Sequence, residues 1–278
     1  MSIEALTMSV SINVTWGKGC GISHPGKVRT RNEDRFLLNT WPTEEGILAV
    51  VADGMGGSSA GDIAAQLAIN TFAELLENPL PPEPQQQYDA LLAKCYLADE
   101  RIRCEGVKSF KTLGMGTTLV AAIVTPSTCV HVHAGDSRFY YFHQGKQQYR
   151  TADHSIVEML LELGRIQPED IPTHPMRSVV SSCLGGKNGD GHFSVDPKWD
   201  EANPPIIPLE PGDCFLLCSD GLSSYITAEK LQQLSAQYYL SPFTLSEQLI
   251  QNVLDQSNAS DNITVISLAI AAHPNVPN

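Results

Sequence analysis

Short apolar runs alternate with polar turns along this chain, and an acidic residue stands beside most of the runs. Residues 47–52 lead directly into Asp53, for example, and residues 214–218 are followed two positions later by Asp220. Runs of this length that are rich in leucine and β-branched residues are typical of buried strands when Gly, Asp or Asn bound them. A carboxylate at such a strand end would lie at the rim of a sheet. The acidic residues in these positions are Glu33, Asp34, Asp53, Asp136, Asp220 and Asp261.

Helical spacing of apolar residues predicts two long helices, over residues 63–75 and 91–102, with a proline-rich break between them. A short helix is predicted over residues 156–163, and a further one over residues 245–253 precedes the final strand. Two consecutive helices between strands favour helices layered on a mostly antiparallel sheet over alternating βαβ units. The pattern therefore predicts an α+β fold.

Residues 156–191 differ in character from the rest of the chain. After the short helix they contain prolines and glycines with no clear period, a composition typical of a mobile insertion that carries specificity. No internal repeat or interdomain linker is visible. We therefore predict one domain over residues 13–271, with an insertion at 156–191, between an N-terminal tail of residues 1–12 and a C-terminal tail of residues 272–278.

Charge and composition narrow the function. The formal net charge is −13 and no Lys/Arg-rich run is present, which argues against nucleic acid as a partner. An acidic protein can still accept a phosphorylated substrate if bound cations reverse the local field. The N-terminus lacks a signal-peptide pattern and no apolar run approaches the roughly 20 residues that span a bilayer. We expect no membrane association and a cytoplasmic protein, in which the seven cysteines are reduced.

The acidic residues would form a cation site if their strand ends converged. Any one Asp-Gly or Asp-Asn pair is more often an ordinary turn, but their repetition after strands favours a shared site. Two carboxylates about 4 Å apart repel by roughly 4 kcal/mol at an effective dielectric constant of 20, so a cluster needs bound cations. An all-oxygen ligand set selects Mg²⁺ or Mn²⁺ over Zn²⁺. Two such ions could activate a water molecule for attack on phosphorus.

A set of short motifs contains these acidic residues. The motifs are Arg29-Thr30-Arg31-Asn32-Glu33-Asp34, Ala52-Asp53-Gly54-Met55-Gly56-Gly57, Gly114-Met115-Gly116-Thr117-Thr118, Gly135-Asp136-Ser137-Arg138, Asp153-His154-Ser155, Ser219-Asp220-Gly221-Leu222 and Ser260-Asp261-Asn262-Ile263-Thr264. Together, and in this order, they resemble the metal-dependent PP2C-type protein serine/threonine phosphatases. The resemblance covers nearly the whole chain. It implies a four-layer αββα sandwich of two antiparallel sheets flanked by helices, with the metals at one end and the insertion as a flap beside them.

The resemblance also implies a ligand set for two core Mg²⁺ or Mn²⁺ ions. Asp53 matches the carboxylate that bridges both metals. Glu33 and the carbonyl of Gly54 would hold one ion, directly or through water. Asp220 and Asp261 would hold the other.

Three further roles follow from the same resemblance. Asp136 matches a ligand of a third, weaker metal seen in bacterial members. Asp34 matches a position that orders metal-bound water, and Arg29 matches the phosphate-binding arginine. Sequence alternation alone does not rank Arg29 above Arg31. Met55 stands where eukaryotic members have a histidine proposed as the general acid, and bacterial members often share the methionine.

The implied reaction is hydrolysis of phosphoserine and phosphothreonine by a metal-bridging hydroxide, on protein substrates that a serine/threonine kinase phosphorylates, by a monomeric enzyme. Two alternatives stay open, namely a catalytically inactive scaffold and hydrolysis of small phosphometabolites. Two motif matches are rejected. Cys95 and Arg101 have the spacing of thiol phosphatases but lie in a helical pattern without glycine. Residues 21–27 resemble a phosphate-binding loop, but Val28 replaces its Ser or Thr.

Overall fold

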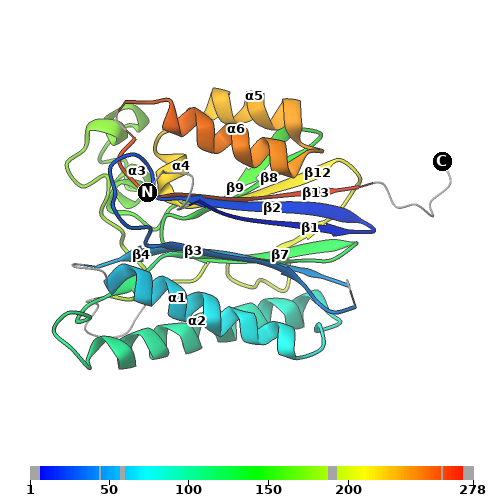
Figure 1. The fold of residues 1–278 in the computed structure, drawn as a ribbon, viewed down its shortest axis with the longest axis horizontal. Coiled ribbons are helices and arrows are strands. Elements are labelled where there is room, and N and C mark those ends of the chain that lie inside the picture. Colours follow the sequence, from blue (N-terminus) through cyan, green and yellow to red (C-terminus); the bar gives the residue numbers. More distant parts are fainter. Residues whose placement is uncertain (1–6, 44, 57–59, 187–192, 258, 272–278) are drawn as a thin grey trace.

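Two antiparallel sheets stacked face to face form the middle of the molecule, and helices cover both outer faces (Figure 1). This computed structural model describes residues 7–43, 45–56, 60–186, 193–257 and 259–271. The arrangement confirms the predicted four-layer αββα sandwich. Gly57 at the end of one motif, the end of the predicted insertion and the predicted C-terminal tail lie outside the described residues.

The first sheet has six strands and contains both ends of the described chain. Its order is β1 (Met8–Val14), β2 (Gly17–His24), β13 (Ile263–Ile270), β12 (Asp213–Cys218), β8 (Arg138–His143) and β9 (Lys146–Arg150). Strand β1 begins at Met8, inside the segment predicted as an N-terminal tail, and pairs with β2 along its whole length. Most of its side chains are exposed, because it is an edge strand. Its apolar pattern is therefore too weak to mark it as a strand.

The second sheet has seven strands. Along it lie β10 (Leu184–Gly185), β5 (Gly116–Thr117), β4 (Ile47–Met55), β6 (Leu119–Val124), β7 (Thr128–Ala134) and β11 (Ile206–Pro208), with β3 (Asp34–Thr40) paired to β4. The pairing of β3 with β4 places Asp34 directly opposite Asp53. Two of the predicted site residues thus meet through strand register alone.

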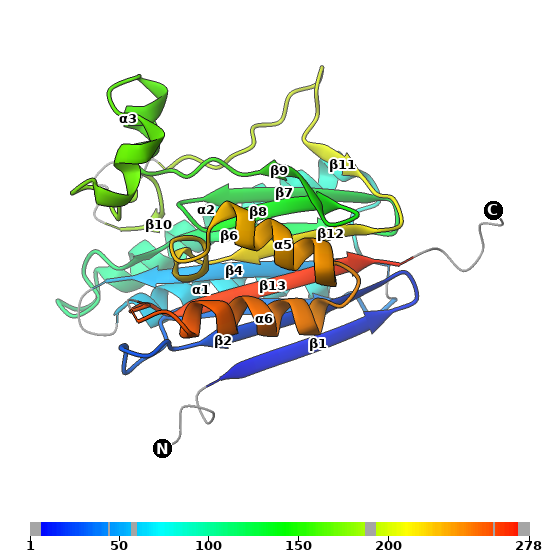
Figure 2. The ribbon, with the colours of Figure 1, turned by 90° about the horizontal axis from the view of Figure 1, so that it is seen from above.

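The helices lie on the outer faces and at one end. Helices α1 (Ala60–Ala73) and α2 (Pro84–Gly106), with the 3₁₀ turn η2 (Glu74–Glu77) between them, cover the second sheet, and α5 (Ala228–Tyr238) and α6 (Pro242–Leu254) cover the first (Figure 1). The single turn α4 (Asp220–Ser223) follows β12, and α3 (Ile156–Glu162) and η3 (Pro168–Thr173) belong to the insertion. Figure 2 shows α3 standing away from the sheets.

The helix predictions were confirmed for α1, α2, α3 and α6, whereas α5 was not predicted. Few of its residues are buried, among them Leu231 and Leu234, so its apolar stripe is narrow. None of the helices among the described residues is long and apolar enough to cross a lipid bilayer.

Burial on both faces explains why the strands are continuous apolar runs. In β12, Leu216 belongs to the core beneath α5 and α6 together with Leu245. Its neighbours Phe215 and Leu217 belong instead to the core between the two sheets. Successive strand residues point to opposite faces, so a strand in the middle of four layers has no solvent face and no polar alternation. The acidic residues of the predicted site therefore stand at or beyond the strand ends.

Candidate metal centre

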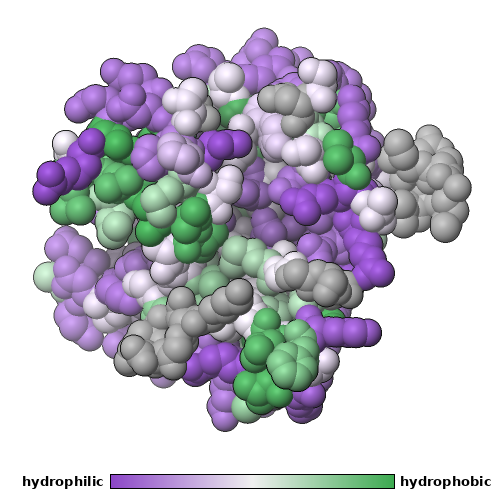
Figure 3. All heavy atoms as spheres, turned by 90° about the vertical axis from the view of Figure 1, so that its left-hand side faces the viewer, coloured by the Kyte–Doolittle hydropathy of each residue, from purple (hydrophilic) through white to green (hydrophobic). Residues whose placement is uncertain are grey.

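A cavity of about 280 Å³ opens at the end of the sandwich where α3 and α4 lie, the end that faces the viewer in Figure 3. Seven of the eight predicted site residues line it, and Asp34 lies buried behind them with 1% of its surface exposed. The lining residues are Arg29, Glu33, Asp53, Gly54, Met55, Gly56, Thr118, Asp136, Ser178, Val180, Asp220, Asp261 and Asn262. The structure therefore brings together side chains that are up to 232 residues apart in sequence, as Arg29 and Asp261 are.

Asp53 is held at the end of β4 by Thr117, the last residue of β5, and by Thr118, which follows it. Its carbonyl accepts hydrogen bonds from the Thr118 N–H and the Thr117 hydroxyl, both at 2.9 Å. The N–H of Asp53 donates to the Thr118 hydroxyl at 3.3 Å. The main chain of Asp53 is thus fixed without using its carboxylate, which remains for a ligand. The role of these threonines was not predicted, although they belong to one of the quoted motifs.

Asp34 is anchored by the segment that leads into α4. Its Oδ2 accepts a 2.8 Å hydrogen bond from the Ser219 hydroxyl, whose oxygen accepts the Thr264 N–H at 3.0 Å. These bonds connect β3 of the second sheet to β12 and β13 of the first. Burial raises the pKa of Asp34 to about 7, and the charges of Asp220 and Asp261 add to this increase.

Two Asp-Gly pairs require their glycines because the backbones approach closely. A Cβ on Gly54 would overlap the carbonyl of Gly61 at the start of α1 and would lie 2.7 Å from the Glu33 carbonyl oxygen. A Cβ on Gly221 would overlap the carbonyl oxygen of Asn262. The glycines therefore do more than make turns, because they let separate strand ends close around the cavity.

Asn262 connects three segments beneath the cavity. Its amide group donates to the carbonyls of Pro25 and Arg31 at 3.0 and 2.8 Å, and its Oδ1 accepts the Glu33 N–H at 2.8 Å. Both of its amide N–H groups and one acceptor position of Oδ1 are used inside the protein, so Asn262 positions Glu33. The sequence signal was the Asp-Asn pair before β13, which we interpreted only through Asp261.

The partly buried carboxyl groups around the cavity are energetically costly without bound cations. Loss of water raises the pKa of Asp53, Asp136 and Asp220, and mutual repulsion among the carboxylates adds to it. For Asp136 the value reaches about 7. The pKa of the more exposed Glu33 is raised mainly by desolvation as well. Nearby cations would lower these pKa values and remove the repulsion.

The donor set suits hard cations. The cavity offers carboxylate oxygens and the Gly54 segment, and neither His nor Cys lines it. Among the described residues, no three His, Cys, Asp or Glu side chains are grouped tightly enough to hold a metal by themselves. Mg²⁺ keeps several water ligands and uses only one or two carboxylates, so a spaced ring of acids fits it better than it fits Zn²⁺.

Arg29 reaches the cavity from the segment before β3. Its Nη2 lies 3.1 Å from Oδ2 of Asp261, and 52% of its side-chain surface is exposed. The Asp261 carboxylate raises the pKa of the guanidinium further, so it stays charged. Arg31 does not line the cavity and its side chain is exposed. The structure therefore favours Arg29 over Arg31, a choice that alternation along the chain left open.

A second cavity of about 690 Å³ adjoins the first beneath the insertion. It shares Asp136, Ser178, Asp220 and Asp261 with the smaller one. Hydroxyl groups of residues 155, 223–225 and 260 line much of the rest. The acidic cavity thus continues into a longer polar depression between α3 and α4.

The rejected thiol motif has no access to a substrate. Cys95 is fully buried in α2, and burial raises the pKa of its thiol. Arg101 of α2 donates to Glu74 of η2 and to the Thr71 hydroxyl of α1. The pair therefore lies in the helical layer, away from both cavities.

Three comparisons with known proteins agree with this geometry. The family described as Protein phosphatase 2C matches residues 20–261. The serine/threonine phosphatase stp of Listeria innocua is 31% identical over 244 residues, which cover 87% of this chain and 91% of that protein. The crystal structure of the Mycobacterium tuberculosis serine/threonine phosphatase PstP superposes with a TM-score of 0.77 at 29% identity, covering 92% of this chain and 100% of that one. The crystal structure of the catalytic domain of PstP in complex with two manganese ions gives a TM-score of 0.74 at 28% identity. The match covers 92% of this chain and 99% of that one.

Proposed function

The chain belongs to the protein phosphatase 2C family, and from that premise we propose that it hydrolyses phosphoserine and phosphothreonine in proteins with divalent cations as cofactors. The observation that carries the proposal is the set of partly buried carboxylates around one cavity, where the pKa values of Asp53, Asp136 and Asp220 are raised, with the charged Arg29 beside Asp261. Perturbed titratable groups gathered in a cleft are typical of functional sites.

We assign the cations to the carboxylates of the cavity. Asp53, Glu33 and the Gly54 carbonyl would hold one ion, and Asp53, Asp220 and Asp261 would hold the other. Asp136 would serve a third, weaker ion. Mg²⁺ and Mn²⁺ both suit such oxygen ligands. When bound, these ions lower the pKa of water and neutralise charge on the phosphoryl group.

The protein's own residues bind and orient the reactants. Arg29 is half exposed and permanently charged, so its planar guanidinium is suited to hold two phosphoryl oxygens at once. Asp34, fixed by Ser219 and opposite Asp53, would accept a hydrogen bond from the attacking water and orient it. Met55 lines the cavity, but its thioether has no acidic proton to donate. The leaving oxygen would therefore take its proton from water.

We expect water to attack phosphorus directly, without a phosphoenzyme. The cavity lining contains the hydroxyls of Thr118 and Ser178, but the Thr118 hydroxyl is already bonded to the Ser137 hydroxyl at 2.7 Å. Ser178 belongs to the insertion, where no described base is bonded to it. A single turnover in ¹⁸O-labelled water should label the released phosphate once with or without a phosphoenzyme, so acid quench is the decisive step. It should trap no covalent phosphoprotein, and a trapped one would contradict the mechanism.

We further propose a monomeric enzyme in the cytoplasm that reverses the action of a serine/threonine kinase. It would have one phosphatase domain that starts at β1, with an insertion over residues 156–191 that acts as a flap. The larger cavity beneath that insertion, of about 690 Å³, would accept residues that flank the phosphorylated one.

The direct test is hydrolysis of p-nitrophenyl phosphate and of a phosphothreonine peptide by the full chain. Activity should disappear with EDTA and return with Mn²⁺ or Mg²⁺. Hydrolysis of the small ester alone would favour phosphometabolites as substrates. A folded protein that binds Mn²⁺ but hydrolyses neither compound would favour the scaffold alternative and contradict the proposal.

A further inference from the structure

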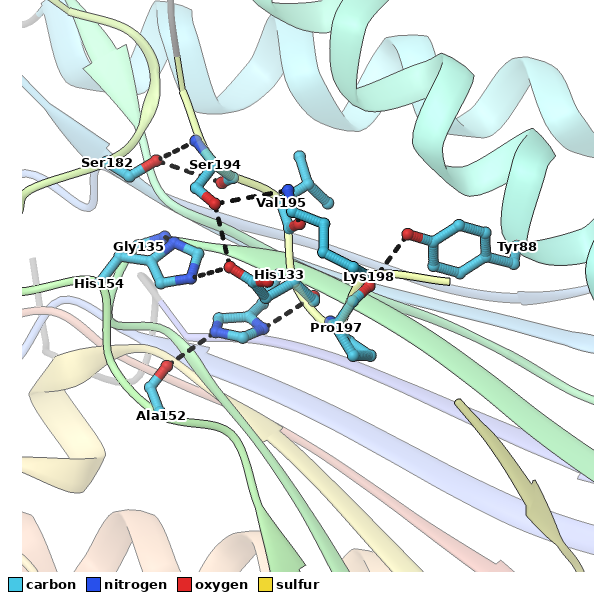
Figure 4. A network of polar contacts seen from close by, with 11 residues as sticks. Tyr88, His133, Gly135, Ala152, His154, Ser182, Ser194, Val195, Pro197 and Lys198 are labelled. Atoms are coloured by element: carbon cyan, nitrogen blue, oxygen red, sulfur yellow. Dashed lines mark hydrogen bonds and ion pairs between the residues drawn. The ribbon is translucent and has the colours of Figure 1, made fainter. Parts of the chain in front are cut away.

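His154 binds the loop that carries Asp136 through both its ring and its main chain (Figure 4). The Gly135 N–H donates to its Nδ1 at 3.3 Å, and the His154 N–H donates to the Gly135 carbonyl at 2.9 Å. Because Nδ1 accepts a hydrogen bond, the ring proton stands on Nε2. That nitrogen lies 2.9 Å from Oδ2 of Asp196 and donates to it.

Asp196 is itself held firmly. Its Oδ2 also accepts the Ser194 hydroxyl at 3.0 Å. Its main chain exchanges two hydrogen bonds with His133 of β7, at 2.7 and 3.0 Å. The neighbouring Val195 is buried at 1% exposure in the core beneath α1 and α2. Asp196 thus presents its carboxylate to His154 from a segment anchored in the second sheet.

The same histidine also attaches the base of the insertion. The His154 carbonyl accepts the Ser181 N–H at 2.8 Å. The next residue, Ser182, accepts the Ser194 N–H at 2.8 Å and donates to the Ser194 carbonyl at 3.2 Å. One position before Ser181, Val180 lines the acidic cavity. His154 is therefore in contact with the insertion side of the cavity as well as the Asp136 side.

Two residues, Thr118 and His154, hold the loop that carries Asp136. Gly135 has a φ of +111°, and a Cβ there would lie 2.7 Å from the Thr118 side chain, so Thr118 already packs closely against one face of the loop. His154 bonds to it from another direction. Asp136, which follows, lines both cavities. A change at His154 or Asp196 should therefore reach the acidic cavity through Asp136.

We propose that His154 and Asp196 form a positioning pair that holds the Asp136 loop against the base of the insertion and so sets the wall shared by the two cavities. Neither residue lines the acidic cavity, so they act through Asp136 and Val180 and not on substrate directly. The inference rests on the proposed phosphatase function. Partners that orient ligand-bearing groups typically change metal affinity or activity about 10–100-fold when removed.

The test compares Asp196→Ala with Asp196→Asn. The alanine removes the oxygen that accepts from both His154 and Ser194, whereas the amide oxygen of asparagine accepts the same two bonds. We expect Asp196→Ala to raise the half-saturating concentration of the weakest-bound Mn²⁺, the ion assigned to Asp136, about tenfold in calorimetry and in p-nitrophenyl phosphate hydrolysis. Asp196→Asn should stay within about twofold of the original protein. His143→Ala is the matched control, because it removes a comparable His–Asp contact, 2.8 Å from Asp213, at the other end of β8.

A double substitution separates positioning from general weakening. In an Asp136→Ala background, Asp196→Ala should cause no further loss of Mn²⁺ affinity, because the group it positions is already gone. Additive losses, equal losses in the Ala and Asn variants, or unchanged Mn²⁺ binding in Asp196→Ala would each overturn the proposal. If Asp196→Ala does not fold, His154→Phe is the substitute. It keeps an aromatic ring in place but removes the ring's contacts with Gly135 and Asp196, and the same tenfold change is expected. An original protein that is inactive with Mn²⁺ would contradict the proposed function instead.

Discussion

The acids around the cavity and the two histidines inside β7 are both shielded from water, but they differ in how their charges are compensated. Around the acidic cavity, Asp53, Asp136 and Asp220 repel one another and have raised pKa values. In β7, His131 and His133 are more deeply buried, at 3% exposure each, and burial lowers their pKa values. Desolvation favours the neutral form in both groups, but a neutral carboxyl is protonated and a neutral histidine is not.

The two groups also differ in their partners. His133 lies between the carbonyls of Ala152 and Asp196, at 2.8 and 3.0 Å. His131 stacks on Phe139 with ring centroids 4.2 Å apart. The histidines are thus packed by the protein itself, whereas the acids face a cavity. The contrast teaches that burial does not by itself identify a site, and that uncompensated like charge facing open space does.

Substitution of one carboxylate that faces the cavity and of one that protein groups surround should separate function from stability most strongly. Asp53→Asn removes charge where the acids repel, so turnover should fall on the order of 10³-fold while the denaturant midpoint measured in EDTA rises. Asp213→Asn is the counterpart, because Asp213 accepts from Tyr141 at 3.2 Å and from the Glu210 N–H at 2.7 Å. It should lower stability and leave the activity of folded molecules unchanged. A stability loss in Asp53→Asn would show that the acidic cavity is not strained.

The pH dependence of unfolding in EDTA should have opposite signs for the two groups. Asp34 has a folded pKa of about 7, above its unfolded value of about 4, so the stability it contributes is present below pH 4 and is lost as pH rises to 7. His131 has a folded pKa of about 3, below its unfolded value of about 6.5, so its contribution is present above pH 6.5 and is lost as pH falls toward 3.

Variants distinguish these two contributions. His131→Phe should reduce the loss of stability between pH 6.5 and 3 by several kcal/mol, roughly 1.4 kcal/mol per pH unit of the window. Asp34→Asn should reduce the loss between pH 4 and 7. Urea titrations at each pH give both quantities. Identical pH profiles for either variant and the original protein would contradict the assignment for that residue.

Arg29 provides a smaller test of the acidic cavity. Removal of a charge-assisted bond to the phosphoryl group costs about 1.5–3 kcal/mol, so Arg29→Ala should lower kcat/KM for p-nitrophenyl phosphate roughly ten- to 150-fold. Mn²⁺ binding should persist, because the carboxylates remain. Arg31→Ala is the control and should have little effect, since its side chain is exposed outside the cavity. A larger loss at Arg31 would reverse the choice between the two arginines.

Cys95 should show the smallest effect on activity. Cys95→Ser places a hydroxyl in the apolar core beneath α2, which should cost about 1–3 kcal/mol of stability. Its kcat and KM should remain unchanged, because the thiol lies in the helical layer. A large loss of kcat in folded Cys95→Ser would support the thiol mechanism that we reject.

Local pattern was enough to predict the strands with two buried faces, the helices α1, α2, α3 and α6, and the acidic residues at strand ends. Burial on both faces produces continuous apolar runs, and helical burial produces its own spacing, so these features are written in short stretches of sequence. The shared order of the motifs indicated the family. Edge strand β1 and helix α5 were missed because both bury few apolar side chains.

Only the tertiary structure decided how the strand ends meet. The Asn262 contact to Glu33 spans 229 residues and the Ser219 contact to Asp34 spans 185, so no local pattern contains them. The same holds for the position of Arg29 beside Asp261 and for the link from His154 to Asp196. A period of two residues specifies which face a side chain occupies, but register and stacking between distant strands determine which side chains touch. The sequence by itself therefore determined the kinds of groups in the site, and long-range pairing determined their geometry.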